Sequence, residues 1–464
     1  MSAWLDLTRG IVERGRAMID LRRAATPDAE GVLELFARLV GAVGEASGTA
    51  LAAEALERYG ALPEGERRLV LVGLAERFEP DGDRLYAAIA RHQADPSPLS
   101  TAALHTASEP PRQELLRRLN RAPGGTAALV AMREDVINAK RHDPSLAVVD
   151  DDFRHLFSSW FNRGFLTMRR IDWQTPAAIL ERIIRYEAVH EIGDWADLRR
   201  RIDPPDRRLY AFFHPALPGE PLIFVEVALT ASMPASIEAV LRADREPLAP
   251  AEARVATFYS ISNCQRGLAG ISFGSFLIKQ VASELTAEFP AIDTFVTLSP
   301  VPELRAWARE EATERPDATL VDAVAILSDD LSPEKVDAVR GILEPLARAY
   351  LTEAKNARGR PRDPVARFHL GNGARLERLC WMGDPSPKGL AQSWGAMVNY
   401  RYVLEDIERN HEAYANEARV VTGPLWRRGG GRTITLRRTK SPPRTAKPDG
   451  TEPDGAEPGA DAAT

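Results

Sequence analysis

Three glycines, Gly267, Gly270 and Gly274, crowd the short segment between a strand-like run and an amphipathic, helix-like run. The first N–H groups of a helix have no partner inside it, so a helix start built from small residues can bind an anion through its backbone. The segment therefore predicts a site for a phosphate-bearing ligand. Glycine-rich turns also allow close packing in proteins that bind nothing, and that interpretation stays open here. The spacing matches neither a P-loop, which needs Gly-Lys-Ser/Thr, nor the Gly-x-Gly-x-x-Gly of dinucleotide-binding domains.

Ser299 and His369 are the two side chains in the most unusual surroundings. Ser299 ends an apolar run directly before Pro300, which restricts the serine to an extended backbone. His369 lies in the string RFHLGNG, beside two glycines and a carboxamide. The structural alternatives are a serine that only ends a strand and a histidine packed in the core. No Gly-x-Ser-x-Gly occurs, so the pattern does not support a hydrolase with a nucleophile elbow.

The histidines and cysteines do not form a metal-binding pattern. None of the eight histidines pairs with another at ligand spacing, and no HExxH occurs. Cys264 and Cys380 lie far apart and form no CxxC, which fits a reducing compartment. We therefore predict no metal site. Cys264 adjoins the glycine turn, so a reactive thiol is an alternative to a packed one.

Hydrophobic periodicity predicts the elements that position these residues. Apolar side chains recur at helical spacing over residues 276–285, and short runs rich in β-branched and aromatic residues flank them. A further helix is predicted over 399–409. The mixture is typical of an α/β or α+β domain. Strands are predicted at residues 209–213, 222–229, 257–261 and 295–298.

The chain divides into three parts by composition. Residues 1–148 carry amphipathic stripes with short linkers, which predicts a helical bundle that serves as a scaffold or oligomerisation domain. Residues 149–426 hold the predicted strands and the candidate site, and are expected to form the catalytic domain. Residues 427–464 are rich in Gly, Pro, Arg and acidic residues, and we expect a disordered tail.

Charge and hydropathy argue against two classes of partner. The net charge of −6 argues against nucleic acid. No apolar run reaches the ~18 residues that a membrane helix needs, so no membrane partner is expected. The arginine-rich N-terminus carries Asp6, Glu13 and Asp20, and transit peptides avoid acidic residues. Together with the heavy use of Ala and Arg, these features predict a cytoplasmic protein from a bacterium with a GC-rich genome.

Five strings in order resemble the malonyl-CoA decarboxylase family, and they cover roughly residues 150–415. The strings are HPALPGEPLIFVEVALT, FYSISNCQRGLAGISFGSFLIKQV, FVTLSPVP, FHLGNGARLERLCWM and NYRYVLED. The resemblance implies an N-terminal helical bundle followed by a mixed α/β catalytic domain similar to GNAT-type acetyltransferases. In such folds a glycine turn between a central strand and the next helix receives the pyrophosphate of coenzyme A.

The resemblance also implies site residues. The family's catalytic serine and histidine fall on Ser299 and His369, and a tyrosine near its active site falls on Tyr402. Residues 265–270 resemble the acetyltransferase turn Gln/Arg-x-x-Gly-x-Gly/Ala, but Leu268 stands where that pattern has glycine. Family members often carry an acidic residue where this chain has Ser272. The backbone that binds coenzyme A is placed at Ala269, Gly270, Ile271, Ser272, Phe273, Gly274 and Ser275.

The implied activity is that of a carboxy-lyase, which converts malonyl-CoA to acetyl-CoA and CO2. Loss of CO2 leaves an enolate, and no cofactor is needed because the thioester takes up the electrons. His369, with an ordinary pKa near ~6.5, would protonate the α-carbon. Ser299 would bind the malonyl group or relay a proton. The family also implies a homotetramer, built as a dimer of dimers through the helical domain, and a role in malonate catabolism or in fatty acid metabolism through control of malonyl-CoA.

Two other functions stay open. Another coenzyme A enzyme on the same fold, such as an N-acetyltransferase, would need an amine acceptor and a base. A non-enzymatic scaffold that binds acyl-CoA would not turn it over, and replacing Ser299 or His369 would leave that function intact. The presence of both residues in the contexts quoted above argues against the scaffold.

Overall fold

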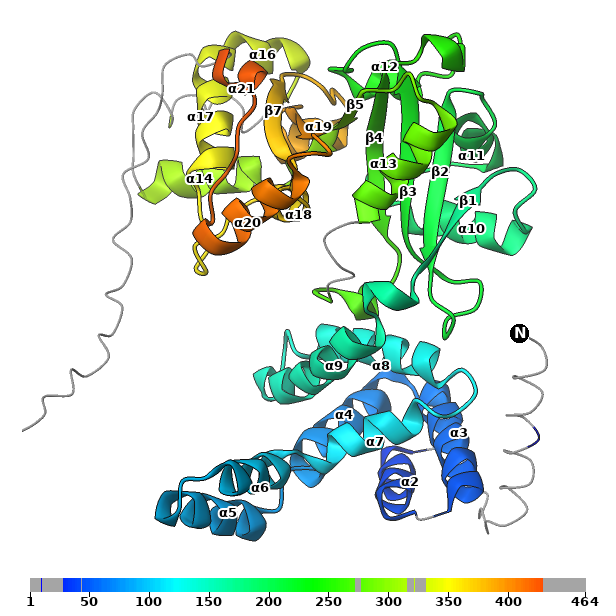
Figure 1. Ribbon diagram of the computed structural model, residues 1–464, viewed down its shortest axis with the longest axis vertical. Helices are drawn as coiled ribbons and strands as arrows, with labels where there is room; N and C mark the ends of the chain where they lie inside the picture. Colours follow the sequence, from blue (N-terminus) through cyan, green and yellow to red (C-terminus); the bar gives the residue numbers. More distant parts are fainter. Residues whose placement is uncertain are drawn as a thin grey trace, which may run out of the picture.

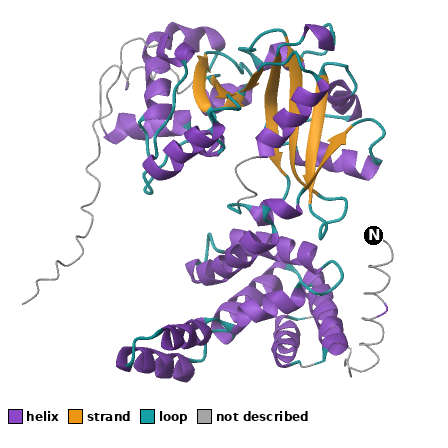
Figure 2. Ribbon diagram, viewed as in Figure 1, coloured by secondary structure: helices purple, strands orange, loops and turns teal. Residues whose placement is uncertain are grey.

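The structure is a computed structural model that describes residues 28–42, 44–271, 277–314 and 331–428, with Gly10 and Val321 in addition. These residues form a helical unit followed by a mixed α/β unit, as Figures 1 and 2 show. The predicted fold class is therefore confirmed. The predicted tail lies outside the described residues from residue 429 onwards.

The helical unit consists of short helices with recognisable start signals. Asp28 caps the α2 helix by accepting a hydrogen bond from the Gly31 N–H, and Ser97 forms a capping box with Ser100 at the start of α6. α9 packs against α7 and α8, so the predicted boundary between residues 148 and 149 falls inside a helix of this unit. The helices are α2 (Ala29–Gly41), α3 (Glu45–Ala61), α4 (Glu64–Arg77), α5 (Gly82–Ala94), α6 (Pro98–Ser108), α7 (Pro111–Leu119), α8 (Gly125–Ala139) and α9 (Ala147–Trp160), with the 3₁₀ helix η1 (Pro144–Leu146) before α9.

An eight-stranded sheet organises the α/β unit. The order is β1-β2-β3-β4-β5-β8-β6, with β7 paired to β8, and β4 runs parallel to β5. The predicted strands correspond to β2, β3, β4 and β5. The strands are β1 (Thr167–Ile171), β2 (Arg207–Phe213), β3 (Pro221–Thr230), β4 (Val255–Asn263), β5 (Thr294–Thr297), β6 (Ser299–Pro300), β7 (Arg375–Cys380) and β8 (Met397–Tyr402).

Helices cover both faces of this sheet. Neighbouring side chains of β3 point to opposite faces: Val225 joins the core that includes Val281 of α13, and Phe224 joins the core that includes Ile183 of α10 and Leu198 of α11. Within the described part of the chain, no helix has both the length and the apolar character needed to cross a bilayer. The helices of this unit are α10 (Ala177–Tyr186), α11 (Trp195–Ile202), α12 (Ile237–Leu241), α13 (Leu277–Glu288), α14 (Leu304–Glu314), α16 (Pro333–Ala338), α17 (Arg340–Thr352), α18 (Pro364–Gly371), α19 (Pro387–Ser393), α20 (Ile407–Glu417) and α21 (Pro424–Arg428), with the 3₁₀ helices η2 (Arg163–Phe165), η3 (Pro250–Glu252) and η4 (Arg266–Leu268).

The helix predicted over residues 399–409 is wrong. This stretch ends strand β8 at Tyr402, and α20 begins only at Ile407. β8 lies inside the sheet, where it pairs with β5, β6 and β7. Its sequence, MVNYRY, is rich in residues that suit a pleated surface, and tertiary pairing decided its conformation.

Candidate active site

The candidate site lies where the sheet separates. β4 and β5 pair in parallel as far as Phe258, whose carbonyl also accepts the Leu298 N–H (2.9 Å). Beyond this point β4 pairs with β3 alone, whereas the chain after β5 passes into β6 and pairs with β8. A β-bulge at Tyr259 bends β4 at the same level. Ser299 therefore lies where the two halves of the sheet part.

Ser299, His369 and Tyr402 belong to one chain of hydrogen bonds, together with Thr297. Ser299 Oγ lies 3.0 Å from His369 Nε2, and His369 Nδ1 lies 2.9 Å from the Tyr402 hydroxyl oxygen. The Ser299 hydroxyl donates to Thr297 Oγ1 at 2.8 Å. All four side chains are buried. The structure therefore brings together the three residues predicted to be catalytic, from β6, α18 and β8.

The donor and acceptor of each bond follow from this geometry. The Ser299 hydroxyl hydrogen is directed to Thr297, so Ser299 Oγ accepts from the His369 Nε2–H. His369 Nδ1 then carries no hydrogen and accepts from the Tyr402 O–H. Burial raises the pKa of Tyr402, so its hydroxyl stays protonated. The arrangement selects the tautomer of His369 that is protonated on Nε2.

The ring of His369 is packed among aromatic side chains. It stacks on Tyr400 with 4.6 Å between ring centroids and 25° between ring planes, and Phe368 lies edge-on at 5.1 Å. Burial lowers the pKa of His369 to about 3, because a charged imidazolium would lose its hydration there. The imidazole is therefore neutral near pH 7 in the ligand-free protein, whereas the sequence suggested a group at its ordinary pKa.

Replacing Tyr402 by phenylalanine tests the chain of hydrogen bonds. The substitution removes the donor to His369 Nδ1 and keeps the ring, which packs edge-on to Phe258 at 6.3 Å. We expect kcat to fall by about 10- to 100-fold, because the imidazole can then adopt either tautomer. Tyr210→Phe is the matched control, since the Tyr210 hydroxyl is buried, has no hydrogen-bond partner among the described residues and lies outside the site. An unchanged kcat in Tyr402→Phe would contradict the proposal that the Tyr402 hydroxyl selects the tautomer of His369.

Asp363 starts the helix that carries His369. Its carboxylate caps α18 by accepting the Ala366 N–H (2.8 Å), and the Tyr350 hydroxyl lies 3.4 Å away. Asp363 has no exposed surface, and burial raises the pKa of its carboxyl group to about 7. The unfolded chain releases this proton near pH ~4. The folded protein therefore binds the extra proton between these two pH values and loses stability as the pH rises through that range.

Asp363→Asn should remove this pH dependence. Asparagine still offers a capping oxygen but carries no charge that becomes buried as the pH rises. The free energy of unfolding of Asp363→Asn minus that of wild type should rise by about 1–3 kcal/mol between pH 5 and pH 8. Urea denaturation at the two pH values measures it. Asp28→Asn, at the cap of α2, is the control for exchanging a capping carboxylate for an amide. If Asp363→Asn loses stability relative to wild type as the pH rises, the burial argument fails.

The turn predicted to bind coenzyme A follows β4 directly. It begins with η4 and continues through Ala269, Gly270 and Ile271. Gly270 has φ of +75°, a conformation that favours glycine, and its N–H has no hydrogen-bond partner among the described residues. Leu268, which replaces a glycine of the acetyltransferase pattern, is buried in the core. The other predicted contacts, Ser272, Phe273, Gly274 and Ser275, lie outside the described residues.

The structure also bears on the metal and thiol interpretations. Among the described residues, no group of three or more His, Cys, Asp or Glu side chains gathers as metal ligands would. Cys264 packs in an apolar cluster, and burial raises the pKa of its thiol. The packed thiol is therefore favoured over the reactive one.

The sequence analysis did not single out three residues that contact or support the site, namely Thr297, Asn399 and Tyr400. Thr297 Oγ1 accepts the Tyr400 N–H at 3.1 Å as well as the serine hydroxyl, and Asn399 Nδ2 donates to the Thr297 carbonyl at 2.7 Å. The alternation in MVNYRY was the available signal for Tyr400, because residues two apart share one face of a strand. No signal in the sequence pointed to Thr297 or Asn399.

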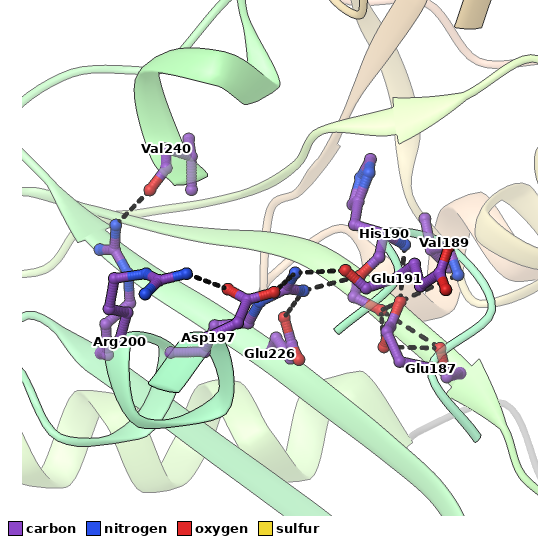
Figure 3. A network of polar contacts seen from close by, with 12 residues as sticks. Glu187, Val189, His190, Glu191, Asp197, Arg200, Glu226 and Val240 are labelled. Atoms are coloured by element: carbon purple, nitrogen blue, oxygen red, sulfur yellow. Dashed lines mark hydrogen bonds and ion pairs between the residues drawn. The ribbon is translucent and has the colours of Figure 1, made fainter. Parts of the chain in front are cut away.

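A buried polar network holds β4 from the other face of the sheet (Figure 3). The carboxylate of Glu187 accepts the Ser260 and Ser262 hydroxyls, at 2.7 and 3.0 Å, and two backbone N–H groups of its own loop. Beside it, Arg201 donates to Glu226 on β3 at 3.3 Å. Both serines belong to the half of β4 that leads into the glycine turn, so the network fixes the approach to that turn.

Comparison with known proteins identifies the relatives of this chain. The family model described as the malonyl-CoA decarboxylase C-terminal domain matches residues 164–429, and the N-terminal domain model matches residues 78–161. The solved malonyl-CoA decarboxylase from Rhodopseudomonas palustris is 53% identical, with a TM-score of 0.82 over 86% of this chain and 99% of that one. The solved enzyme from Agrobacterium vitis is 50% identical, with a TM-score of 0.80 over 86% and 100%.

A relative from an animal is also similar over most of its length. The mitochondrial malonyl-CoA decarboxylase of Anser anser anser is 37% identical over 402 residues, which are 78% of this chain and 79% of that protein. The chain belongs to the malonyl-CoA decarboxylase family.

Proposed function

We propose that the chain decarboxylates malonyl-CoA and forms acetyl-CoA and CO2. As a member of its family it is an enzyme, a carboxy-lyase. The observation that carries the proposal is the buried pair Ser299 and His369, 3.0 Å apart, at the point where β4 and β5 separate. The turn that follows β4 contains the Gly270 N–H, which has no partner among the described residues and can donate to an anion.

Decarboxylation breaks the bond between the α-carbon and the carboxylate carbon. The electron pair moves to the α-carbon and into the thioester carbonyl, which gives an enolate as CO2 leaves. The enzyme must stabilise this enolate more than the ground-state carboxylate. Hydrogen-bond donors near the thioester oxygen and the exclusion of water both contribute. Ser299 and His369 are 5% and 3% exposed, which supports a site closed to bulk water. The thioester is the electron sink, so the reaction needs no cofactor.

His369 is the proposed source of the proton that completes the methyl group. The incoming malonyl carboxylate brings a negative charge, and an opposite charge nearby raises the pKa of an imidazole. The substrate therefore opposes the effect of burial on His369, and the imidazole is proposed to take up a proton from solvent and become the imidazolium when the substrate binds. The Nε2–H faces Ser299 Oγ, so we assign Ser299 as the relay: its hydroxyl hydrogen passes to the α-carbon while Oγ takes the proton from His369. His369 is then the neutral imidazole again, so each turnover takes up one proton from solvent.

The assembly and location carry over as proposals. We propose a homotetramer built as a dimer of dimers, in the bacterial cytoplasm, that acts in malonate catabolism or in control of malonyl-CoA. Exposed apolar side chains on the helical unit support association through it: Leu69, Tyr86 and Leu99 are 56%, 73% and 80% exposed. Light scattering after size-exclusion chromatography tests the stoichiometry, and a monomer at micromolar concentration would contradict the proposal.

The activity is tested with purified protein and malonyl-CoA, with Ser299→Ala and His369→Ala alongside. Acetyl-CoA and CO2 should form in equal amounts and should be lost in both variants. A parallel sample with acetyl-CoA and a set of amines tests acetyl transfer. Transfer to an amine without decarboxylation would favour the acetyltransferase. Binding of coenzyme A without turnover would favour the scaffold, and either result would overturn the proposal.

A further inference from the structure

The helical unit contacts the glycine turn through one buried arginine on α8. Arg133 donates from Nη1 to the Gly267 carbonyl at 2.6 Å and from Nη2 to the Ala269 carbonyl at 2.9 Å. Its Nε donates to Asp150 of α9 at 3.0 Å, and the side chain is 2% exposed. Figure 1 shows α8 and α9 on the side of the helical unit that faces the sheet. A single guanidinium thus joins two helices to the turn.

A second contact brings the backbone of the glycine turn close to the backbone of α8. A Cβ atom added to Gly267 would lie 1.9 Å from the Val130 carbonyl oxygen of α8, so no side chain fits at this position. Arg266, in the same turn, pairs with Glu134 at 3.2 Å and donates to Asn138 at 3.3 Å. Three positions one turn apart on α8, at Val130, Glu134 and Asn138, therefore lie against Gly267 and Arg266.

The two carbonyl contacts fix the direction of the neighbouring N–H groups. In a trans peptide the C=O and the N–H of the next residue point in opposite directions. The Ala269 carbonyl points to Arg133, so the Gly270 N–H points away from α8, and it has no partner among the described residues. The N–H groups of Leu268, Ala269 and Ile271 are already bonded within the turn. Between Leu268 and Ile271, Gly270 is therefore the residue whose N–H has no partner among the described residues.

We infer that Arg133 is a positioning residue for the acyl-CoA turn, and the inference rests on the proposed function's placement of coenzyme A there. The guanidinium holds the peptide between Ala269 and Gly270 so that its N–H meets the ligand's pyrophosphate. The assigned role is geometric, because both Nη groups of Arg133 are used on the two turn carbonyls, and its Nε pairs with Asp150, which Lys140 also contacts. The helical unit, predicted from sequence to be a scaffold, then takes part in substrate binding.

Arg133→Gln and Arg133→Lys test this role, with Arg112→Gln as the matched control. Arg112 is also a buried arginine of the helical unit paired with a carboxylate of α9, Asp152, but it does not contact the turn. We expect Arg133→Gln to raise KM for malonyl-CoA and Kd for coenzyme A by about 10- to 100-fold, with kcat within about threefold of wild type. Arg133→Lys keeps the charge but cannot span both carbonyls and Asp150, so it should show a smaller rise. Arg112→Gln should lower the melting temperature and leave KM unchanged.

The outcomes separate this inference from the proposed function. If Arg133→Gln and Arg133→Lys bind coenzyme A like wild type while Gly270→Asp does not, the turn binds the ligand and the positioning role is wrong. If none of the three changes the affinity, the placement of coenzyme A is wrong. If Arg133→Gln does not fold, Arg133→Lys decides, and an unchanged KM in that variant overturns the inference.

Discussion

With glutamine in place of His369, kcat for malonyl-CoA is expected to fall by about 10²- to 10⁴-fold. Glutamine can still donate a hydrogen bond to Ser299 but cannot gain and release a proton. The affinity for coenzyme A should stay close to that of wild type, because the nucleotide is proposed to bind at the turn and not at the imidazole. Stopped-time assays of acetyl-CoA formation and titration calorimetry with coenzyme A measure the two quantities separately.

His214→Gln is the control for the loss of a buried histidine. His214 bonds to the Trp160 carbonyl and the Ala216 N–H, outside the chain of hydrogen bonds around Ser299. This variant should keep kcat. Turnover at the wild-type rate in His369→Gln would assign the proton donor to another group. Equal losses in both variants would indicate a folding defect in place of a chemical one.

Gly270→Asp should weaken binding of both malonyl-CoA and coenzyme A by about 30- to 100-fold. A carboxylate about 7 Å from a pyrophosphate charge costs about 2–3 kcal/mol at an effective dielectric constant near 20. No atom of the described residues lies within 4 Å of a Cβ at this position, so none of them clashes with the side chain. The binding constant for coenzyme A, measured by titration calorimetry, is the direct readout.

Gly270→Asn separates the charge from the backbone strain. Aspartate and asparagine at position 270 must both adopt φ of +75°. Asparagine has nearly the same shape as aspartate, and both tolerate this region. The difference between the two variants therefore reports the charge alone, and it should shrink in high salt. Equal affinities for the aspartate and asparagine variants would mean that no ligand phosphate lies near Gly270.

The sequence was informative where local pattern sets local structure. The strand, helix and strand around the glycine turn appear as predicted, because β-branched and aromatic content and helical spacing specify β4, α13 and β5, whereas the turn is described only as far as Ile271. The pairing of Ser299 with His369 depends on topology: 70 residues separate them, and only the insertion of β8 beside β5 and β6 brings their elements together. The family resemblance, and not periodicity, pointed to the two as candidate catalytic residues.

The protonation state of His369 shows what sequence cannot give. An isolated histidine has its pKa near ~6.5, whereas the stacked Tyr400 ring and the surrounding core lower the pKa of His369 to about 3. That environment is assembled from α18 and β8, and β8 was mistaken for a helix because a short aromatic stretch with charged residues fits both periods. Thr297 was missed for a related reason, since its role appears only when the Ser299 hydroxyl has a defined direction.

The most direct test of the account is decarboxylation of malonyl-CoA in D2O, with acetyl-CoA analysed by mass spectrometry and CO2 measured in the same sample. The account predicts one CO2 for each acetyl-CoA and one deuterium newly introduced into each methyl group, with both products lost in His369→Gln. Acetyl-CoA formed at the wild-type rate by that variant would contradict the central role of His369. No CO2 from the wild-type protein would contradict the activity itself.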